Sequence, residues 1–182
     1  SFTKINYIIS CLASRTGGPE DAWLVDYKAN MNLLRLAIKN NISHYILLSA
    51  ICVQKPMLEF QKAKLAFENE LIRSDVTYSI VRATAFFKSL SGQIINVKNG
   101  KKFVIFDNGE TTRCKPISAQ DLSLFIVQCL DNIDHINKIL PIGGPGPAIT
   151  PLEMGQMLFK LTGQQEKFRN IPSNLFIFGG NI

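Results

Sequence analysis

A lysine, Lys64, lies in what is otherwise the apolar face of a predicted helix. At about 100° per residue, Phe60, Lys64, Phe67 and Leu71 fall on the same side of that helix, whereas Lys62 points to the opposite side. A lysine can reach water from the rim of a core by extending its aliphatic chain. Otherwise a partly desolvated ammonium needs an anion or several oxygen acceptors, which a bound ligand can supply. The residues alone leave both interpretations open.

Small and polar residues follow three predicted buried strands, and ligands of open parallel sheets bind at that end of the strands. For each segment alone, a polar turn after a strand is the simpler interpretation. Their shared position makes them candidates for a common ligand site. The three segments are Cys11-Leu12-Ala13-Ser14-Arg15, Leu48-Ser49-Ala50-Ile51-Cys52 and Arg82-Ala83-Thr84-Ala85-Phe86-Phe87.

The glycine-rich stretch GGPGP at 143–147 lies between a strand-like segment and a predicted helix, where a phosphate-binding loop would be placed. It lacks the third glycine of such a loop. Its two prolines also remove N–H groups that would have to face the phosphate. We therefore expect a connecting turn.

The composition indicates a globular protein. The 182 residues are 46% hydrophobic and 19% charged, and this length is within the usual size of one domain. The apolar runs are shorter than the ~20 residues of a membrane span, so we expect a soluble protein. The four cysteines form no CxxC pair and have two histidines to complement them. We expect buried, reduced thiols in an intracellular compartment, and no metal site.

The formal net charge of +6 is spread along the sequence. Nucleic-acid binding would favour a clustered basic stripe with interleaved aromatic residues, so we do not expect a nucleic-acid partner. An anionic small molecule accounts for the charge equally well.

The first half of the chain has the pattern of consecutive parallel βαβ units. Buried β-branched segments alternate with helical segments, and Pro19 starts the first helix, with two acidic residues in its first turn. The expected elements are a buried strand at 5–11, a helix from Pro19 to about 40–41, a strand at 44–50, a helix containing Lys64 and a strand at 78–82.

The second half is less regular. Segments 101–106 and 111–117 flank Asp107-Asn108-Gly109, which predicts a tight hairpin or a three-residue loop. Helices are expected over 121–130 and 152–161, the latter with a capping box at Thr150 and an end at Gly163. The fold class is therefore α/β, with a parallel core and a smaller C-terminal cap.

Several segments resemble, in order, the NADPH-dependent 8-vinyl reductases of chlorophyll biosynthesis, a family among the atypical, NmrA-like short-chain dehydrogenases/reductases. The resemblance covers about residues 5–170 and is most specific in LLSAICVQKP followed by EFQKAK. The other matching stretches are SCLASRTGG, VDYKANMNLL, YSIVRATAFFKSLSGQI, CKPIS and IGGPGPAITPLEMGQMLFKL.

This resemblance implies part of a Rossmann-like parallel sheet with helices on both faces. It also implies that residues 100–182 contribute a substrate cap. Relative to the family pattern, the first strands and their glycine-rich phosphate loop precede Ser1, and the natural end lies beyond SNLFIFGGNI. On that basis we expect the 182 residues alone to be a fragment of the enzyme, inactive by itself.

The superfamily uses a YxxxK pair, in which the lysine holds the nicotinamide ribose and the tyrosine donates a proton. Here Phe60 takes the tyrosine position and Lys64 keeps the lysine position. This is intelligible if NADPH reduces a carbon–carbon double bond, because no alkoxide forms. The proton donor stays open among Ser49, Cys52 and a water.

The resemblance implies reduction of the 8-vinyl group of divinyl (proto)chlorophyllide to ethyl, in a cyanobacterial cytoplasm or a plastid. We expect a tetrapyrrole partner, no membrane span and possible peripheral membrane association. Expected catalytic residues are Lys64 and Ser49. Expected NADPH-binding residues are Cys11, Leu12, Ala13, Ser49, Ala50, Lys64, Thr84, Ala85 and Phe86, and expected substrate-binding residues are Phe60, Phe87, Arg15 and Lys55.

Two alternatives are weighed against this function. A dinucleotide-binding NmrA-like regulator would share the strands and loops without catalysis, although it need not hold the ribose with Lys64. A related reductase would act on an isoflavone-like or quinone substrate, and the stretch QKPMLEFQKAK ranks it lower.

Overall fold

The computed structural model describes residues 5–176, which form two compact units. The first comprises the chain up to Thr84 together with Gln120–Ile142, and the second comprises Ala85–Ala119 and the chain from Gly143. Residues 120–142, which the sequence analysis assigned to a C-terminal cap, therefore belong to the first unit. Residues 1–4 and 177–182 lie outside the described residues.

The first unit is built on a parallel sheet with the strand order β1-β2-β3-β5. Short apolar, β-branched runs form these strands, as the sequence pattern predicts. All neighbouring pairs are parallel, so the carboxyl ends of the strands lie along one edge of the sheet. The strands are β1 (Tyr7–Ser10), β2 (His44–Ala50), β3 (Tyr78–Ala83) and β5 (Lys138–Ile142).

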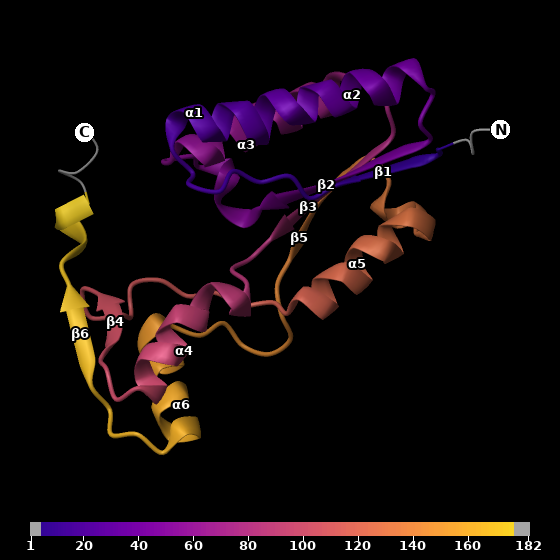
Figure 1. The fold of residues 1–182 in the computed structure, drawn as a ribbon. Helices are drawn as coiled ribbons and strands as arrows, with labels where there is room; N and C mark the ends of the chain where they lie inside the picture. The colour runs from indigo at the N-terminus through magenta and orange to yellow at the C-terminus, as the bar shows by residue number, and fades with distance from the viewer. Residues whose placement is uncertain (1–4, 177–182) are drawn as a thin grey trace. The chain divides into compact units, whose positions relative to one another are not determined.

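Helices lie on both faces of this sheet, which confirms the predicted architecture. Figure 1 shows α1, α2 and α3 on one face and α5 on the other. The helical elements are α1 (Pro19–Ala22), the π-helix η1 (Trp23–Ala29), α2 (Asn30–Lys39), η2 (Ile51–Gln54), α3 (Glu59–Arg73), α5 (Ala119–Asp131) and η4 (Ile133–His135).

The long first helix starts at Pro19, as predicted, but it is not α-helical throughout. Its middle section, η1, is a π-helix of seven residues. The Asn30 side chain donates its amide hydrogens to the carbonyls of Val25, at 3.4 Å, and Asp26, at 3.0 Å. Hydrogen bonds from a side chain to backbone carbonyls in this way stabilise the wider, π-helical turn.

The prediction of a buried strand at 5–11 is wrong in both length and burial. The observed strand β1 has four residues, and Tyr7 and Ile9 are 47% and 44% exposed. The cause is its position, since β1 pairs with β2 alone among the described strands.

The core of the first unit lies between the sheet and the paired helices. Phe67 and Leu71 of α3 are fully buried, as the helical wheel predicts, and pack with Tyr45 of β2 and Ile80 of β3. The rings of Tyr45 and Phe67 are 5.9 Å apart. This packing fixes α3 on the sheet and thereby places Lys64, one turn before Phe67.

The second unit contains a small parallel sheet. Strand β4 pairs with β6, and Val97, Phe103, Ile105 and Phe159 form its core. Helix α6 has the predicted capping box at Thr150 and a left-handed C-cap at Gly163. The elements are η3 (Phe87–Leu90), α4 (Ser91–Lys98), β4 (Phe103–Phe106), α6 (Pro151–Thr162), β6 (Phe168–Ile171) and η5 (Ser173–Phe176).

The predicted hairpin around Asp107-Asn108-Gly109 is wrong. The turn itself forms, with the Gly109 N–H donating to the Phe106 carbonyl at 2.8 Å. The chain that follows does not pair with β4, whose partner in the described sheet is the parallel strand β6. Cys114 instead forms an isolated bridge with Ile149.

Candidate functional site

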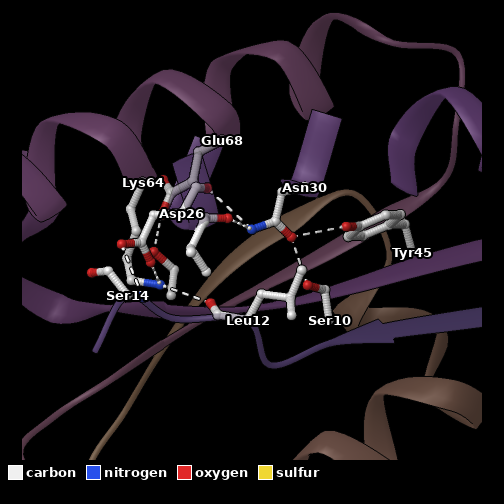
Figure 2. Close-up of polar contacts among 10 residues, drawn as sticks. Ser10, Leu12, Ser14, Asp26, Asn30, Tyr45, Lys64 and Glu68 are labelled. Carbon is white, nitrogen blue, oxygen red and sulfur yellow. Dashed lines mark hydrogen bonds and ion pairs between the residues drawn. The ribbon is translucent and has the colours of Figure 1, made fainter. Parts of the chain in front are cut away.

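Lys64 forms a buried ion pair with Asp26. Its Nζ lies 2.8 Å from Asp26 Oδ1, and the side chains are 12% and 0% exposed, respectively. Nζ also donates to the Leu12 carbonyl at 3.4 Å. These contacts, drawn in Figure 2, join α3 to η1 and to the loop after β1. The anion that a lysine in this stripe requires is therefore supplied by the chain itself.

The second oxygen of Asp26 faces the loop that follows β1. Asp26 Oδ2 accepts a hydrogen bond from the Ser14 N–H at 3.3 Å. Apart from the ion pair with Lys64, Oδ1 has no hydrogen-bond donor in the described part of the chain. Removal of the ammonium would therefore leave a desolvated, uncompensated charge.

Asn30, one turn after Asp26, is the centre of a second buried group. Its Oδ1 accepts hydrogen bonds from the hydroxyls of Ser10, at 2.6 Å, and Tyr45, at 3.1 Å (Figure 2). Burial raises the pKa of Tyr45 to about 12, so its hydroxyl stays a donor at neutral pH. The side chain of Asn30 thereby ties the π-helix to β1 and β2.

Ser49 belongs to a third buried group, at the carboxyl end of β2. Its Oγ donates to Glu68 Oε1 at 2.5 Å. Arg82 of β3 contacts the same carboxylate through Nε and Nη2, the latter at 2.5 Å from Oε2. Glu68 is 0% exposed and Ser49 is 5% exposed. A buried carboxylate with an arginine and a hydroxyl partner links α3 to two strands.

The structure brings several predicted cofactor-binding residues to the same edge of the sheet. Cys11, Leu12 and Ala13 follow β1 and are exposed, whereas Ser49 and Ala50 end β2 and are buried and half-buried. Desolvation of the thiol raises the pKa of Cys11, and the positive charge of Lys64 acts in the opposite direction. The exposed loop lies beside Lys64 through the contact of Leu12.

The predicted residues after β3 belong to different units. Thr84 is the last residue of the first unit before the chain enters the second, and its N–H donates to the Ile142 carbonyl at 3.0 Å. Ala85, Phe86 and Phe87 open the second unit and are exposed. A shared site formed by these residues and Lys64 stays a prediction.

Among the predicted substrate-binding residues of the first unit, Phe60 is half-buried, and Arg15 and Lys55 are exposed. Phe60 Cδ1 lies 3.6 Å from the position that a Cβ on Gly17 would occupy. The ring therefore packs beside the loop that precedes α1. Phe60 precedes Lys64 by one turn of α3, as predicted.

Phe87 lines an apolar cavity within the second unit. The volume of this cavity is about 190 Å³. It is bounded by apolar side chains alone, which suits an apolar group of a ligand. The described lining residues are Phe87, Ile94, Phe103, Ile149, Met154, Met157, Leu158 and Leu161.

Asp26, Asn30 and Glu68 are not among the site residues predicted from the sequence. Their signal is present in the sequence: Asp26 and Asn30 are four residues apart in one apolar stripe, and Lys64 and Glu68 are four apart in another. Two facing helices that each bury two polar residues one turn apart indicate paired polar groups.

Thiol burial also differs from the prediction. Cys11 and Cys52 are exposed, Cys114 is half-buried and Cys129 is buried, and all four are free. Within residues 5–176, no group of three or more histidine, cysteine or acidic side chains could hold a metal ion. The helices of this range include none that is long and apolar enough to cross a membrane.

Comparisons with known proteins assign most of the chain to an NAD(P)H-binding family. A family model described as NAD(P)H-binding matches residues 2–133. The chain is 54% identical over 179 residues to divinyl chlorophyllide a 8-vinyl-reductase of Cucumis sativus, and 53% identical over 180 residues to that of Arabidopsis thaliana. Each match covers 96% of this chain and 43% of the relative, so the chain spans less than half the length of these relatives.

The same span has a more distant likeness to Photosystem II assembly factor Ycf39 of Guillardia theta. The identity is 26% over 179 residues, which covers 98% of this chain and 56% of that protein. The sequence identity to the two plant reductases, at 53–54%, is thus about twice as high.

Solved structures show the fold. UDP-glucuronic acid 4-epimerase from Bacillus cereus, in complex with NAD, aligns with a TM-score of 0.80 at 16% identity, covering 92% of this chain and 62% of that one. UDP-glucose 4-epimerase from Thermotoga maritima, with UDP-glucose, aligns with a TM-score of 0.79 at 17% identity, covering 92% and 64%. These likenesses establish the Rossmann-type sheet.

Proposed function

The chain belongs to the NAD(P)H-binding family, and on that premise we propose that the protein is an NADPH-dependent reductase that converts the 8-vinyl group of a divinyl chlorophyllide into ethyl. One observation carries the proposal: 53–54% identity to plant 8-vinyl-reductases over 92–96% of the chain. The names of these relatives also support a plastid location, although a cyanobacterial cytoplasm fits the same chemistry.

The surroundings of Lys64 fit a nicotinamide cofactor. An ammonium donates three hydrogen bonds, and Asp26 and Leu12 are the acceptors that the described chain provides. A third donor is left for an acceptor such as a ribose hydroxyl. Cys11, Leu12, Ala13, Ala50 and Thr84 would contribute to the same cofactor site, because they follow neighbouring parallel strands.

NADPH supplies a hydride when it is bound. Phe60 cannot donate a proton, and its ring offers an apolar face one turn before Lys64. Hydride addition to a conjugated vinyl group spreads negative charge over the macrocycle, so no phenol is needed beside the reacting carbon. This chain thereby combines a cation that holds the cofactor with an apolar surface for the substrate.

Ser49 is better suited to a positioning role than to proton donation. Its hydroxyl proton is directed to Glu68, which Arg82 keeps paired. Ser49 can still accept a hydrogen bond through its oxygen. A water, or the exposed Cys52, remains available as the source of the proton.

The substrate is a flat, anionic tetrapyrrole in this proposal. Phe60 would provide an aromatic face, and Arg15 or Lys55 would meet the carboxylate. A contact of Phe87 with the substrate stays a prediction. Peripheral attachment to a membrane surface is compatible with this scheme, because the substrate is largely apolar.

One assay tests both the reductase function and the alternative of a catalytically inactive dinucleotide-binding regulator. The natural full-length protein is incubated with divinyl chlorophyllide and either NADPH or NADH, and the pigments are separated by chromatography. We expect the monovinyl product, formed faster with NADPH. No product under conditions where NADPH binding is demonstrated would favour the regulator.

A further inference from the structure

We propose that Asp26 is the positioning residue for Lys64, and that the π-helix around Asp26 is the element that aims it. This inference rests on the proposed function, in which Lys64 holds the nicotinamide ribose. Asp26 itself would not touch the cofactor, because its side chain is 0% exposed and is paired with the lysine. Its effect on cofactor binding passes through the direction of one ammonium group.

The geometry of the lysine supports this role. A lysine side chain has about four rotatable bonds and loses much rotamer freedom when it is held in one position. Asp26 Oδ1, at 2.8 Å, and the Leu12 carbonyl, at 3.4 Å, fix two of the three directions in which Nζ can donate. The third direction is then determined without a ligand. A cofactor hydroxyl would meet a donor whose orientation is already established.

The backbone around Asp26 is specialised for this placement. Asp26 lies in the middle of the seven-residue π-helix, a form that is rare and frequently found at functional sites. Asn30 closes the π-helix by donating to the Val25 and Asp26 carbonyls. Asn30 is itself held by the hydroxyls of Ser10 and Tyr45, both from the sheet. The position of the Asp26 carboxylate is thus fixed relative to β1 and β2, the strands that end beside the proposed cofactor site.

A purely structural ion pair is the competing explanation. Buried pairs contribute little net stability compared with apolar residues of similar volume, so stability alone gives weak reason for this one. The two explanations differ in what cofactor binding should show. A structural pair affects folding only, whereas a positioning residue affects NADPH affinity and turnover in a protein that remains folded.

The experiment compares four variants of the natural full-length protein with the wild type: Asp26→Asn, Asp26→Glu, Lys64→Ala and the control Glu20→Gln. Glu20 is an exposed acid in α1, close in sequence to Asp26, so its substitution removes the same charge without a buried partner. Three quantities are measured: NADPH affinity by fluorescence titration, turnover, and the ¹H–¹⁵N NMR signal of the Lys64 ammonium in the absence of cofactor. The loss of that signal in Lys64→Ala assigns it.

We expect a slowly exchanging ammonium signal in the wild type and in Glu20→Gln, and its loss in Asp26→Asn. Turnover of folded Asp26→Asn should fall on the order of a hundredfold, the effect of a misplacement of about an ångström. NADPH affinity should fall with it, and Asp26→Glu should recover part of both. Circular dichroism establishes that each variant is folded at the assay temperature.

Three results would overturn the inference in different ways. An unchanged ammonium signal in Asp26→Asn would show that Asp26 does not hold Lys64. A lost signal with affinity and turnover within about twofold of wild type would show that the pair is structural. A wild-type protein with the Asp26-dependent signal but no NADPH binding would refute the proposed function as well.

Discussion

The hydroxyl of Ser49 donates to Oε1 of Glu68 across 2.5 Å, and Glu68 has no exposed surface. Arg82 binds the other carboxylate oxygen, so three elements meet at one buried acid: β2, α3 and β3. Lys64 lies one turn before Glu68 on the same helix. The group around Glu68 therefore fixes α3 against the carboxyl ends of the strands that also carry the proposed cofactor loops.

We predict a large loss of stability in Glu68→Ala and a smaller loss in Ser49→Ala. Glu68→Ala leaves the partly buried Arg82 unpaired, which typically costs about 3–5 kcal/mol. Ser49→Ala removes one hydrogen bond to a carboxylate that keeps its arginine, at a cost of about 1–3 kcal/mol. Urea denaturation of both variants gives the two free energies of unfolding. Equal losses would show that Arg82 does not depend on Glu68.

Removal of one charge of the Lys64–Asp26 pair should lower the stability of the fold much more than removal of both charges. Lys64→Ala leaves the buried Asp26 carboxylate uncompensated, so we expect a loss of about 3–5 kcal/mol in the free energy of unfolding. The pair Lys64→Met with Asp26→Asn removes both charges and should recover most of that loss. Thermal and urea unfolding measure the two effects.

In the same double variant, NADPH affinity and turnover should stay low, because no ammonium remains for the ribose. Lys62→Ala is the matched control: Lys62 is exposed on the opposite side of α3 and contacts Glu59. It should be nearly silent in stability and activity. A double variant with wild-type affinity would make Lys64 a structural lysine.

Sequence reasoning was sufficient for the elements that local patterns specify. The parallel strands, the start at Pro19 and the cap at Thr150 follow from apolar periodicity, proline chemistry and a capping box, all of which act within a few residues. The position of Lys64 near the functional edge of the sheet also follows from the length of the loop and helix before it.

The contacts between distant segments could not be derived in this way. Asp26 and Lys64 are thirty-eight residues apart, and β4 and β6 pair across more than sixty residues. A turn at Asp107-Asn108-Gly109 predicts that the next segment pairs with β4. The strand that actually pairs with β4 is β6, and this choice depends on packing throughout the second unit. The exposure of β1 likewise depends on which strands lie beside it.

In the second unit, Gly155→Ala should destabilise the protein even though alanine favours helices. A Cβ at Gly155 of α6 would lie 2.4 Å from Phe168 Cε1 and 3.0 Å from Phe103 Cδ1. The Phe168 ring cannot move aside easily, because its centroid is 5.4 Å from that of Phe159 and 6.1 Å from that of Phe103. Overpacking of this kind costs about 1–3 kcal/mol, which exceeds the gain of up to about 1 kcal/mol in helix propensity.

Gly92→Ala is the control for this prediction. Gly92 lies in α4 of the same unit, and a Cβ there would meet nothing within 4 Å. The substitution should be neutral or stabilising by less than about 1 kcal/mol. Chemical denaturation of the two variants decides the matter: stabilisation by Gly155→Ala would mean that the aromatic cluster can rearrange.

The last prediction concerns Cys129, whose pKa is raised to about 11 by burial. Its thiol is fully buried and donates to the Phe125 carbonyl at 3.3 Å. In the unfolded chain the thiol ionises near its ordinary value of 9.0. Between these two values the unfolded state binds fewer protons than the folded state, so the contribution of Cys129 to the free energy of unfolding falls as pH rises.

We therefore expect the wild type to lose stability relative to Cys129→Ala between about pH 9 and pH 11. Below pH 9 the difference between the two proteins is constant, because the thiol is protonated in both states. The measurement is urea denaturation of both proteins at a series of pH values. Cys52→Ala, which removes an exposed thiol, should follow the wild-type curve. A difference between wild type and Cys129→Ala that stays constant up to pH 11 would show that solvent reaches the Cys129 thiol in the folded protein.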